Sequence, residues 1–479
     1  MTVAKIEIQQ FRIQDNCQGL DLSEWQDESD TKMLFSEKNR QDLKMIANIS
    51  VKELTQRYPG LLVFPSDINR TQDDIGGHHL IGLGAEKVST GNLMGFVGVN
   101  GTQINICSRF SQDDKSDYFL HYMLCKVFQI NLFNLDYSIS KDAVFDFLLY
   151  LFPHYLKKAM QQGLFKQYQK QQYNNANVRG VINVSRHIRD NIPFKGTISY
   201  DTREHSYDNN ITQLIRHTIE YIRQKPLGKH ILQNDADTFS CVSQIVLATP
   251  SYAQVNRHKV LYANVRPTIH PYFVDYTPLQ RLCMQILRYE TIKYGKEKDK
   301  VYGILFDGAW LWEEYLNTIF KGNGVSVIHA KNKTGEKGIS IYEQGKNCYY
   351  PDFYYMGSDA KKSFVFDAKY KRLNKGHLID EQSGENAISI NRDDLFQMIT
   401  YMHVLPAKHC ALLYPLEVNE IDEDGKQVVK AKPRNLNGFG GEIFGYGLRI
   451  SKATDMTTFW SEMKKTEERF SKEIQYILC

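Results

Sequence analysis

The chain has 479 residues, and its 59 Lys and Arg against 55 Asp and Glu leave a formal net charge of +4. With 42% hydrophobic and 24% charged residues, the composition is that of an ordinary globular protein, which excludes wholesale disorder. The charge excess is too small for a histone-like nucleic-acid binder, so any DNA contact must come from local clusters. At about 150 residues per domain, this length indicates two or three domains.

The compartment follows from the cysteines and the apolar segments. The eight cysteines are scattered and form no CxxC pair, which gives little support to a structural zinc site and suits a reducing compartment. The N-terminus, MTVAKIEIQQF, lacks the apolar core of a signal peptide. The most apolar run, 143–152, is about half as long as a membrane span. We therefore expect a cytoplasmic protein that does not engage a membrane.

The first part of the chain predicts a β-rich N-terminal domain over residues 1–110. Short alternating stretches (KIEIQQFRI, GLLVF, NLMGFVGV and TQINICSRF) are separated by Gly, Asn and Asp, which is typical of strands joined by turns. Residues 1 to about 90 match no family that we can name, so the role of this domain stays open.

The middle part, residues 111–275, predicts a largely helical domain. Apolar residues recur at helical spacing over 118–134 and over 143–169, where Pro153 predicts a kink, and 209–223 also has a helical pattern. Residues 157–190 are basic and contain two tyrosines, a composition that favours contact with nucleic acid but also fits a solvated helix face followed by a loop. The proline-containing stretch 266–278 predicts a linker or a domain edge at the last domain boundary.

The third domain, residues 276–479, has the element order of an α/β fold with a mixed sheet. Helices are predicted from 279 onward, over 309–320 and over 395–405, and strand-like segments lie between them and at 410–416. Two strand-like runs flank the turn-like GSDAKK, so residues 348–370 predict a hairpin.

This hairpin carries the residues that best indicate chemistry. Asp352 lies on its first strand, and Asp367 and Lys369 lie on the second strand, one residue apart, so that both point to the same face. Carboxylates within apolar strands are costly unless they are paired or bind a metal. Two such acids can hold Mg²⁺, and the adjacent lysine can orient water and stabilise a pentavalent phosphate, which predicts phosphodiester hydrolysis. The alternative is an ordinary ion pair at the rim of a hairpin.

Neighbouring residues extend this site. Glu313, on an otherwise apolar helix, can lean toward the metal, although a glutamate in a first helical turn is also favoured by the helix dipole. Gln397 and Tyr401 are four residues apart, share a helix face and can bind either the DNA backbone or the catalytic lysine. Cations that include Lys371 and Arg372 follow the second strand and suit a polyanion.

Together these motifs resemble the PD-(D/E)xK nuclease superfamily. More narrowly, the chain resembles the McrC family, the nuclease subunits of McrBC-type modification-dependent restriction systems, including their LlaJI-like relatives. Further matching stretches are 97–99, 104–109, 178–182 with 186–188, 208–214 and 307–315. The family's I-x-P-[KR] stretch reads Ile106-Cys107-Ser108-Arg109 here and lacks the proline.

The resemblance implies a Mg²⁺-dependent endodeoxyribonuclease that acts on modified double-stranded DNA. It would make Asp352, Asp367 and Glu313 metal ligands and Lys369 the catalytic lysine. McrC-like proteins work with a hexameric AAA+ GTPase, McrB, which binds the GTP. This chain has no GxxxxGK[ST] motif of its own, which agrees with that division. Three arginines of the basic segment would then contact the partner ring or DNA: Arg179, Arg186 and Arg189.

Two other functions remain open on the sequence alone. One is a non-catalytic regulator or scaffold that stimulates an AAA+ motor through a degenerate nuclease fold. The other is a repair nuclease of the RecB type that acts on DNA ends without a GTPase, which the Gln397 and Tyr401 pair also suits.

Overall fold

The computed structural model describes most of the chain, and all structural statements below refer to this part. It comprises residues 9–28, 33–58, 61–65, 75–111, 117–128, 143–225, 228–233, 235–293, 301–330, 337–343, 345, 348–359, 362–373, 390–417, 430–438 and 440–478. Among these residues, no helix combines the length and the apolar character needed to cross a bilayer.

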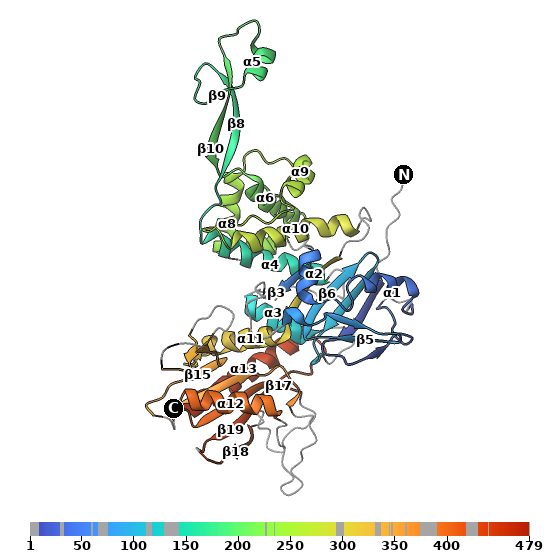
Figure 1. Cartoon of the computed structure of the whole chain (residues 1–479), viewed down its shortest axis with the longest axis vertical. Coiled ribbons are helices and arrows are strands. Elements are labelled where there is room, and N and C mark those ends of the chain that lie inside the picture. The colour runs from blue at the N-terminus through green and yellow to red at the C-terminus, as the bar shows by residue number, and fades with distance from the viewer. Residues whose placement is uncertain are drawn as a thin grey trace. The chain divides into compact units, whose positions relative to one another are not determined.

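The chain divides into two compact units (Figure 1). The insert unit spans Asp142–Glu297, and the sheet unit spans Ile6–Lys141 and Lys298–Cys479. This division differs from the three predicted domains, because the regions before residue 110 and after residue 298 belong to the same unit. The pairing of strand β11 (Val301–Asp307) gives the physical reason.

Strand β11 lies within a five-stranded sheet whose other strands precede the insert unit. The order is β1 (Gln9–Gln14), β7 (Thr102–Cys107), β6 (Leu93–Val99), β11 and β3 (Leu61–Phe64). Strand β11 runs antiparallel to β6 and parallel to β3, and all seven of its residues are buried. In this register Tyr302 lies opposite Gly98, where a side chain would collide with the tyrosine ring.

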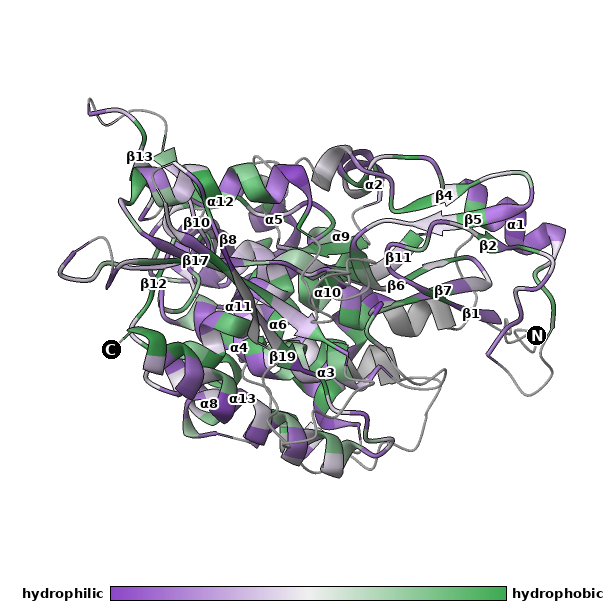
Figure 2. Cartoon of the chain, turned by 90° about the horizontal axis from the view of Figure 1, so that it is seen from below, coloured by the Kyte–Doolittle hydropathy of each residue, from purple (hydrophilic) through white to green (hydrophobic). Residues whose placement is uncertain are grey.

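A smaller sheet and two helices complete the N-terminal part of the sheet unit. The small sheet has the order β2 (Leu20–Asp21), β5 (Lys87–Thr90) and β4 (Ile81–Leu83). Helix α1 (Glu37–Lys44) has the mostly polar sequence EKNRQDLK and is therefore largely purple in Figure 2. Helix α2 (Val51–Arg57) buries Val51 and Leu54 in the same core as the strands.

The rest of the sheet unit contains a six-stranded mixed sheet. Its order is β12 (Ile328–His329), β15 (Phe353–Tyr355), β16 (Phe364–Ala368), β17 (His409–Leu416), β19 (Glu442–Arg449) and β18 (Lys430–Asn435). The central strands β16, β17 and β19 are parallel, and the outer pairs are antiparallel. Strands β13 (Ile339–Ser340) and β14 (Cys348–Tyr349) form a separate short hairpin. The predicted hairpin over 348–370 is confirmed only for 353–368, where β15 pairs with β16, because residues 348–349 pair with β13 instead.

Helices cover both faces of this sheet. Helix α12 (Arg392–Val404) packs on the face that carries Val365 and Leu412. Phe353 lies opposite Phe366 on the other face, and the ring of Phe320 from helix α11 (Gly308–Gly322) contacts Phe353 at 5.2 Å. Helix α13 (Met456–Leu478) packs on the side of α11, where Phe470 stacks on Phe320, and α3 (Tyr118–Phe128) also packs on α11.

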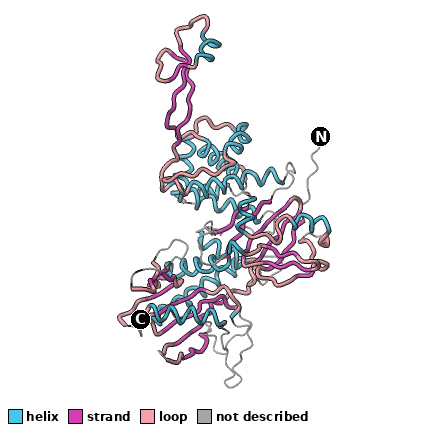
Figure 3. The backbone as a smooth tube through the Cα atoms, viewed as in Figure 1, coloured by secondary structure: helices cyan, strands magenta, loops and turns pink. Residues whose placement is uncertain are grey.

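The insert unit combines a helical bundle with a long hairpin. The bundle contains α4 (Ala143–Met160), α6 (Asn210–Arg223), α7 (Gly228–Gln233), α8 (Ala236–Ala248), α9 (Arg257–Ala263) and α10 (Tyr276–Lys293). Strands β8 (Gln167–Asn175) and β10 (Ile198–Ser206) project from it as an antiparallel pair. Strand β9 (Val181–Ile182) and helix α5 (Val184–Asn191) form the end of the hairpin that is remote from the bundle (Figure 3).

Three sequence-based predictions for this region are wrong. The middle region is not largely helical throughout, because 167–206 contains the three-stranded sheet β8, β10 and β9. The helix predicted over 143–169 ends at Met160, followed by Gly163 in a left-handed conformation with φ of 86°. Residues 266–278 are not a linker: Gln280 accepts a hydrogen bond from the Thr268 amide at 2.8 Å, and α10 packs on α4 and α6 within the insert unit.

Candidate active site

Asp352 directly precedes strand β15, instead of lying on the strand as predicted, and Asp367 lies on the neighbouring strand β16. Phe353, which follows Asp352, pairs with Phe366, which precedes Asp367, and the two carboxylates interact electrostatically. Oδ2 of Asp352 accepts a hydrogen bond from the amide of Ala368 at 2.6 Å, which fixes one carboxylate against the end of β16. Asp367 is only 2% exposed.

Both carboxylates are electrostatically unfavourable in this position. Burial, followed by the negative charges of Asp367 and Glu313, raises the pKa of Asp352 well above its usual range. Burial also raises the pKa of Asp367, and the positive charge of Lys369 only partly offsets that effect. Two acids that repel each other, Asp367 buried and Asp352 half-buried, favour the binding of a cation between them.

Lys369 supplies an ammonium group to these acids from just beyond the end of β16. Its Nζ lies 2.7 Å from Oδ2 of Asp367 and 3.3 Å from Oδ1 of Asp394. Burial acts to lower the pKa of Lys369, but the surrounding carboxylates outweigh it and raise the pKa. The backbone amide of Lys369 donates to the carbonyl of Leu413 at 2.8 Å, so the residue continues the pairing of β16 with β17.

One residue of the predicted helix pair, Gln397, contacts this lysine. Nζ of Lys369 donates to Oε1 of Gln397 at 2.9 Å, and Nε2 of Gln397 donates to the Tyr401 hydroxyl at 2.9 Å. That hydroxyl also bonds to the carbonyl of Tyr350. The sequence left open whether this pair binds the lysine or the DNA backbone. In the structure Gln397 contacts Lys369, and Tyr401 contacts Gln397.

Glu313 approaches the site from helix α11. Its charge is among those that raise the pKa of Asp352, so the two carboxylates are near each other. Oε1 of Glu313 lies 2.7 Å from Nε2 of His329, whose ring stacks on Phe353. Trp312, the preceding residue, anchors the helix by donating to the carbonyl of Leu413 at 3.1 Å.

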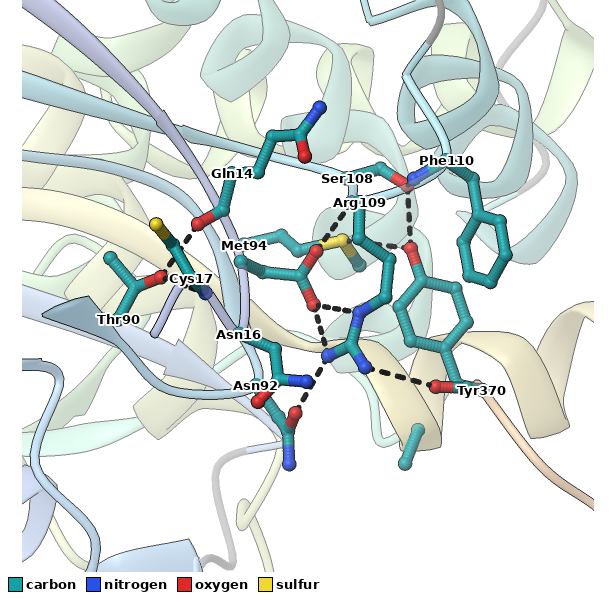
Figure 4. A network of polar contacts seen from close by, with 12 residues as sticks. Gln14, Asn16, Cys17, Thr90, Asn92, Met94, Ser108, Arg109, Phe110 and Tyr370 are labelled. Atoms are coloured by element: carbon teal, nitrogen blue, oxygen red, sulfur yellow. Dashed lines mark hydrogen bonds and ion pairs between the residues drawn. The ribbon is translucent and has the colours of Figure 1, made fainter. Parts of the chain in front are cut away.

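The segment after Lys369 is held by the N-terminal part of the sheet unit (Figure 4). The hydroxyl of buried Tyr370 lies 2.6 Å from Oγ of Ser108. Arg109 donates to the carbonyl of Tyr370 at 3.4 Å and forms a buried ion pair with Asp15 at 2.5 Å. The stretch that lacks the family's proline thus ends in a buried structural arginine.

The predicted contact residues of this segment differ from each other. Lys371 has a side chain that is 44% exposed, and its Nζ pairs with Asp394. Arg372 bonds to the backbone carbonyl of Arg109, pairs with Glu417 at 2.9 Å and lies over the ring of Phe110. The structure therefore assigns Arg372 an internal role instead of the predicted contact with DNA or a partner. Two further lysines of this stretch of the sequence, Lys361 and Lys375, lie outside the described residues.

The three predicted contact arginines belong to the hairpin of the insert unit. Arg179 and Arg189 are exposed, and Arg189 pairs with its neighbour Asp190. Arg186 is mostly buried, donating to the carbonyls of Tyr173 and Tyr200 at 2.7 and 2.8 Å. Arg186 therefore holds the end of the hairpin together, in contrast to its prediction as a contact residue.

Sequence reasoning missed two residues of the site. His329 gave no signal, because it follows a short strand-like run without a motif. Asp394 did have a sequence signal: Asp394, Gln397 and Tyr401 are spaced by three and four residues and therefore share one helix face. Two acids in the first turn of a helix are, however, ordinary partners of the helix dipole.

Comparisons with known proteins agree with this architecture. A family profile described as "McrBC 5-methylcytosine restriction system component" matches residues 88–415. A chain from the half-complex of the tetradecameric assembly of Thermococcus gammatolerans McrB AAA+ hexamers with bound McrC has a TM-score of 0.51 at 15% identity. The match covers 98% of this chain and 100% of that chain, and at this identity it supports the fold alone.

Two further results complete the comparisons. A chain of the Thermococcus gammatolerans McrBC complex matches at 15% identity with a TM-score of 0.33, covering 67% of this chain and 89% of that chain. No curated protein matches significantly. The profile spans more than half of the sequence, including Glu313, Asp352, Asp367 and Lys369. The chain belongs to the family of McrBC 5-methylcytosine restriction system components.

Proposed function

We propose that this chain is the DNA-cleaving subunit of a McrBC-type restriction complex. It would hydrolyse phosphodiester bonds of modified DNA with Mg²⁺, through a PD-(D/E)xK site, when assembled with an AAA+ GTPase that binds the GTP. The observation that carries this proposal is the closeness of Asp352 and Asp367 at the ends of β15 and β16, with the ammonium of Lys369 2.7 Å from Asp367.

The donor set suits a divalent cation. Among the described residues, no three His, Cys, Asp or Glu side chains are already arranged to hold a metal ion. Mg²⁺ does not need such a cage, because it binds through one or two carboxylates and keeps several waters. Asp352 and Asp367 would be its ligands, with Glu313 in support, and the raised pKa of both aspartates indicates negative charge that a cation would relieve.

The balance of charge around the site supports the same conclusion. The cluster contains four carboxylates and two ammonium groups: Glu313, Asp352, Asp367, Asp394, Lys369 and Lys371. With all six ionised, a divalent cation would neutralise the cluster. A buried site of this kind disfavours a persistent excess charge.

Each residue of the site would have a separate role in phosphodiester hydrolysis. Lys369 can hold the attacking water or a phosphate oxygen, because Gln397 and Tyr401 keep its ammonium at the acids. Asp352 is oriented by the Ala368 amide. A bound divalent cation would supply Lewis-acid stabilisation of the charge that develops on the phosphate. The exposed ammonium of Lys371 can attract the DNA backbone toward this position.

The need for a partner is supported by two observations. The chain lacks a P-loop motif, so GTP would be bound elsewhere. The remote end of the hairpin also exposes apolar side chains, which is unusual for a surface that stays in water. These residues are Val181, Val184, Ile188, Ile192 and Phe194, with exposures between 54% and 79%. We propose that this end, with Arg179 and Arg189, contacts the AAA+ ring.

The test is cleavage of modified DNA by the complex with GTP and Mg²⁺. We expect Asp352→Ala and Lys369→Ala each to abolish cleavage while the GTPase rate of the partner is retained. Lys362→Ala, which removes an exposed lysine from the same hairpin, is the matched control and should cut normally.

Two outcomes would favour the other functions. A wild-type complex that never cuts modified DNA, although the chain stimulates the GTPase, would make it a scaffold. Cleavage of linear DNA ends by the isolated chain without GTP would make it a repair-type nuclease. Undiminished cleavage by Lys369→Ala would remove the proposed site altogether.

A further inference from the structure

Asp394 is a buried carboxylate that faces two lysines of the site. It is 5% exposed and lies in the first turn of α12. Nζ of Lys371 donates to its two oxygens at 3.1 and 2.9 Å, and Nζ of Lys369 lies 3.3 Å from Oδ1. A buried charge is costly unless it is paired, and here two ammonium groups pair with one acid.

The position of Asp394 is fixed by the start of its helix. The side chain of Asn391 accepts a hydrogen bond from the Asp394 amide at 2.7 Å, which is an N-cap. Asp394 also shares a helix face with Gln397, whose Oε1 accepts from Lys369. Helix α12 therefore presents two fixed acceptors to the same ammonium group, one charged and one neutral.

The third acceptor of Lys369 is an acid that the cation would also need. Nζ of Lys369 lies 2.7 Å from Oδ2 of Asp367, one of the ligands assigned under the proposed function. An ammonium group and a divalent cation repel each other, so close contact of both with one buried oxygen is unfavourable. When the cation binds to Asp367, the remaining hydrogen-bond acceptors of Lys369 are Asp394 and Gln397 of α12.

We propose that Asp394 is a positioning residue of the active site. It keeps the ammonium of Lys369 at the reaction centre when Asp367 binds the cation. This inference rests on the proposed function. Without the charge of Asp394, Lys369 stays on Asp367 and competes with the cation. Removal of the Asp394 charge should therefore weaken cation binding and slow the chemical step.

The defining variant is Asp394→Asn, and Asp393→Asn is its matched control. Asp393 is the preceding residue, carries the same charge and is exposed. For Asp394→Asn we expect Mn²⁺ binding to the free full-length chain, measured by calorimetry, to weaken by about tenfold. We expect kcat of cleavage in the complex to fall by about tenfold to a hundredfold, since misplacing a catalytic group by about 1 Å has effects of that size. KM for DNA should stay within about twofold, because both lysines keep their charges.

A second pair of variants separates the two lysines. Lys371→Met tests whether Asp394 acts through Lys371, and we expect it to raise KM for DNA, because it removes a cation that attracts the backbone. If Lys371→Met reproduces the losses of Asp394→Asn, Asp394 acts through Lys371 and the proposal is overturned. Should Asp394→Asn fail to fold, Asp394→Glu replaces it, with a smaller loss expected in the same two readouts and wild-type values overturning the proposal.

The outcomes also distinguish this inference from the proposed function. If wild type neither binds Mn²⁺ nor cuts with its partner, the proposed function has failed and Asp394 with it. If wild type does both and Asp394→Asn equals Asp393→Asn in both readouts, only the role of Asp394 has failed.

Discussion

The hydroxyl oxygens of Tyr370 and Ser108 lie 2.6 Å apart, although the two residues are 262 positions apart in the chain. Tyr370 directly follows Lys369, and Ser108 directly follows strand β7. The bond therefore ties the end of the candidate lysine's strand to the N-terminal sheet. Arg109 reinforces it through the carbonyl of Tyr370. The N-terminal region thus supports the candidate active site.

We expect Tyr370→Phe to weaken this support. The substitution removes a hydroxyl that is buried with its partner, so the free energy of unfolding should fall by about 1–3 kcal/mol, and cleavage by the complex should slow because Lys369 loses its fixed neighbour. Denaturant unfolding and single-turnover cleavage measure the two effects. Tyr476→Phe is the control, since Tyr476 is 85% exposed. Equal stability and rate in the two variants would contradict the supporting role.

Much of the candidate site could be predicted from the sequence, because acids in apolar strands are costly and therefore informative. Asp352 and Asp367 stand out for that reason, and Lys369 stands out because it lies two residues after Asp367. In the structure β15 pairs with β16, and Lys369 forms an ion pair with Asp367. Their roles in catalysis remain predictions. Asp394 escaped notice because a first-turn acid has a common local explanation.

The parts of the fold that could not be predicted depend on distant contacts. Strand β8 has the polar sequence QYQKQQYNN, which lacks an apolar face because the hairpin is not part of a core. The sequence of this region therefore predicts helix and loop instead of strands. Likewise, no local pattern in β11 indicates that it pairs with β3 and β6, and this pairing unites the predicted first and third domains.

Two arginines of the hairpin should respond differently to truncation. Arg186→Ala removes the donor that serves the carbonyls of Tyr173 and Tyr200, so we expect faster hydrogen exchange over 173–200 and weaker binding of the partner ring. Arg179→Ala should weaken binding without changing exchange, because its side chain is exposed. Unchanged exchange in Arg186→Ala would contradict its structural role.

His217 should make the insert unit sensitive to acid. Its ring is fully buried in α6, and neither nitrogen has a hydrogen-bond partner within the described part of the chain. Burial, followed by the charges of Arg257 and Arg216, lowers its pKa to about 4. The unfolded chain takes up this proton near pH 6.5, before the folded chain does. Stability from the neutral ring is therefore complete above about pH 6.5 and is lost as the pH falls toward 4.

Comparison of variants isolates this effect from other titrating groups. His217→Leu should lose less stability than wild type between pH 7 and pH 4.5, by up to about 3 kcal/mol, as measured by hydrogen exchange of α6. The control His258→Leu, at an exposed position of α9, should follow the wild-type pH dependence. A wild-type slope in His217→Leu would show that the ring is not the titrating group.

Glu467 should stabilise the junction of three helices in the sheet unit. The residue is 4% exposed, and its carboxylate pairs with Lys126 of α3 at 2.7 Å and accepts from the Tyr315 hydroxyl of α11 at 2.8 Å. Glu467→Gln keeps an acceptor for Tyr315 but loses the ion pair. We expect a loss of about 1–3 kcal/mol in unfolding free energy, below the cost for a fully buried pair, because the Lys126 side chain is 29% exposed and retains water.

A double-mutant cycle measures this coupling directly. Lys126→Met should be costly in wild type but nearly neutral in the Glu467→Gln background, because the charge it pairs with is already absent. Glu468→Gln removes the same charge from the exposed neighbouring position of α13 and should change stability by less than about 0.5 kcal/mol. Additive effects of the Lys126 and Glu467 substitutions would mean that the ion pair contributes nothing to the junction, and that the buried acid is retained for its bond to Tyr315 alone.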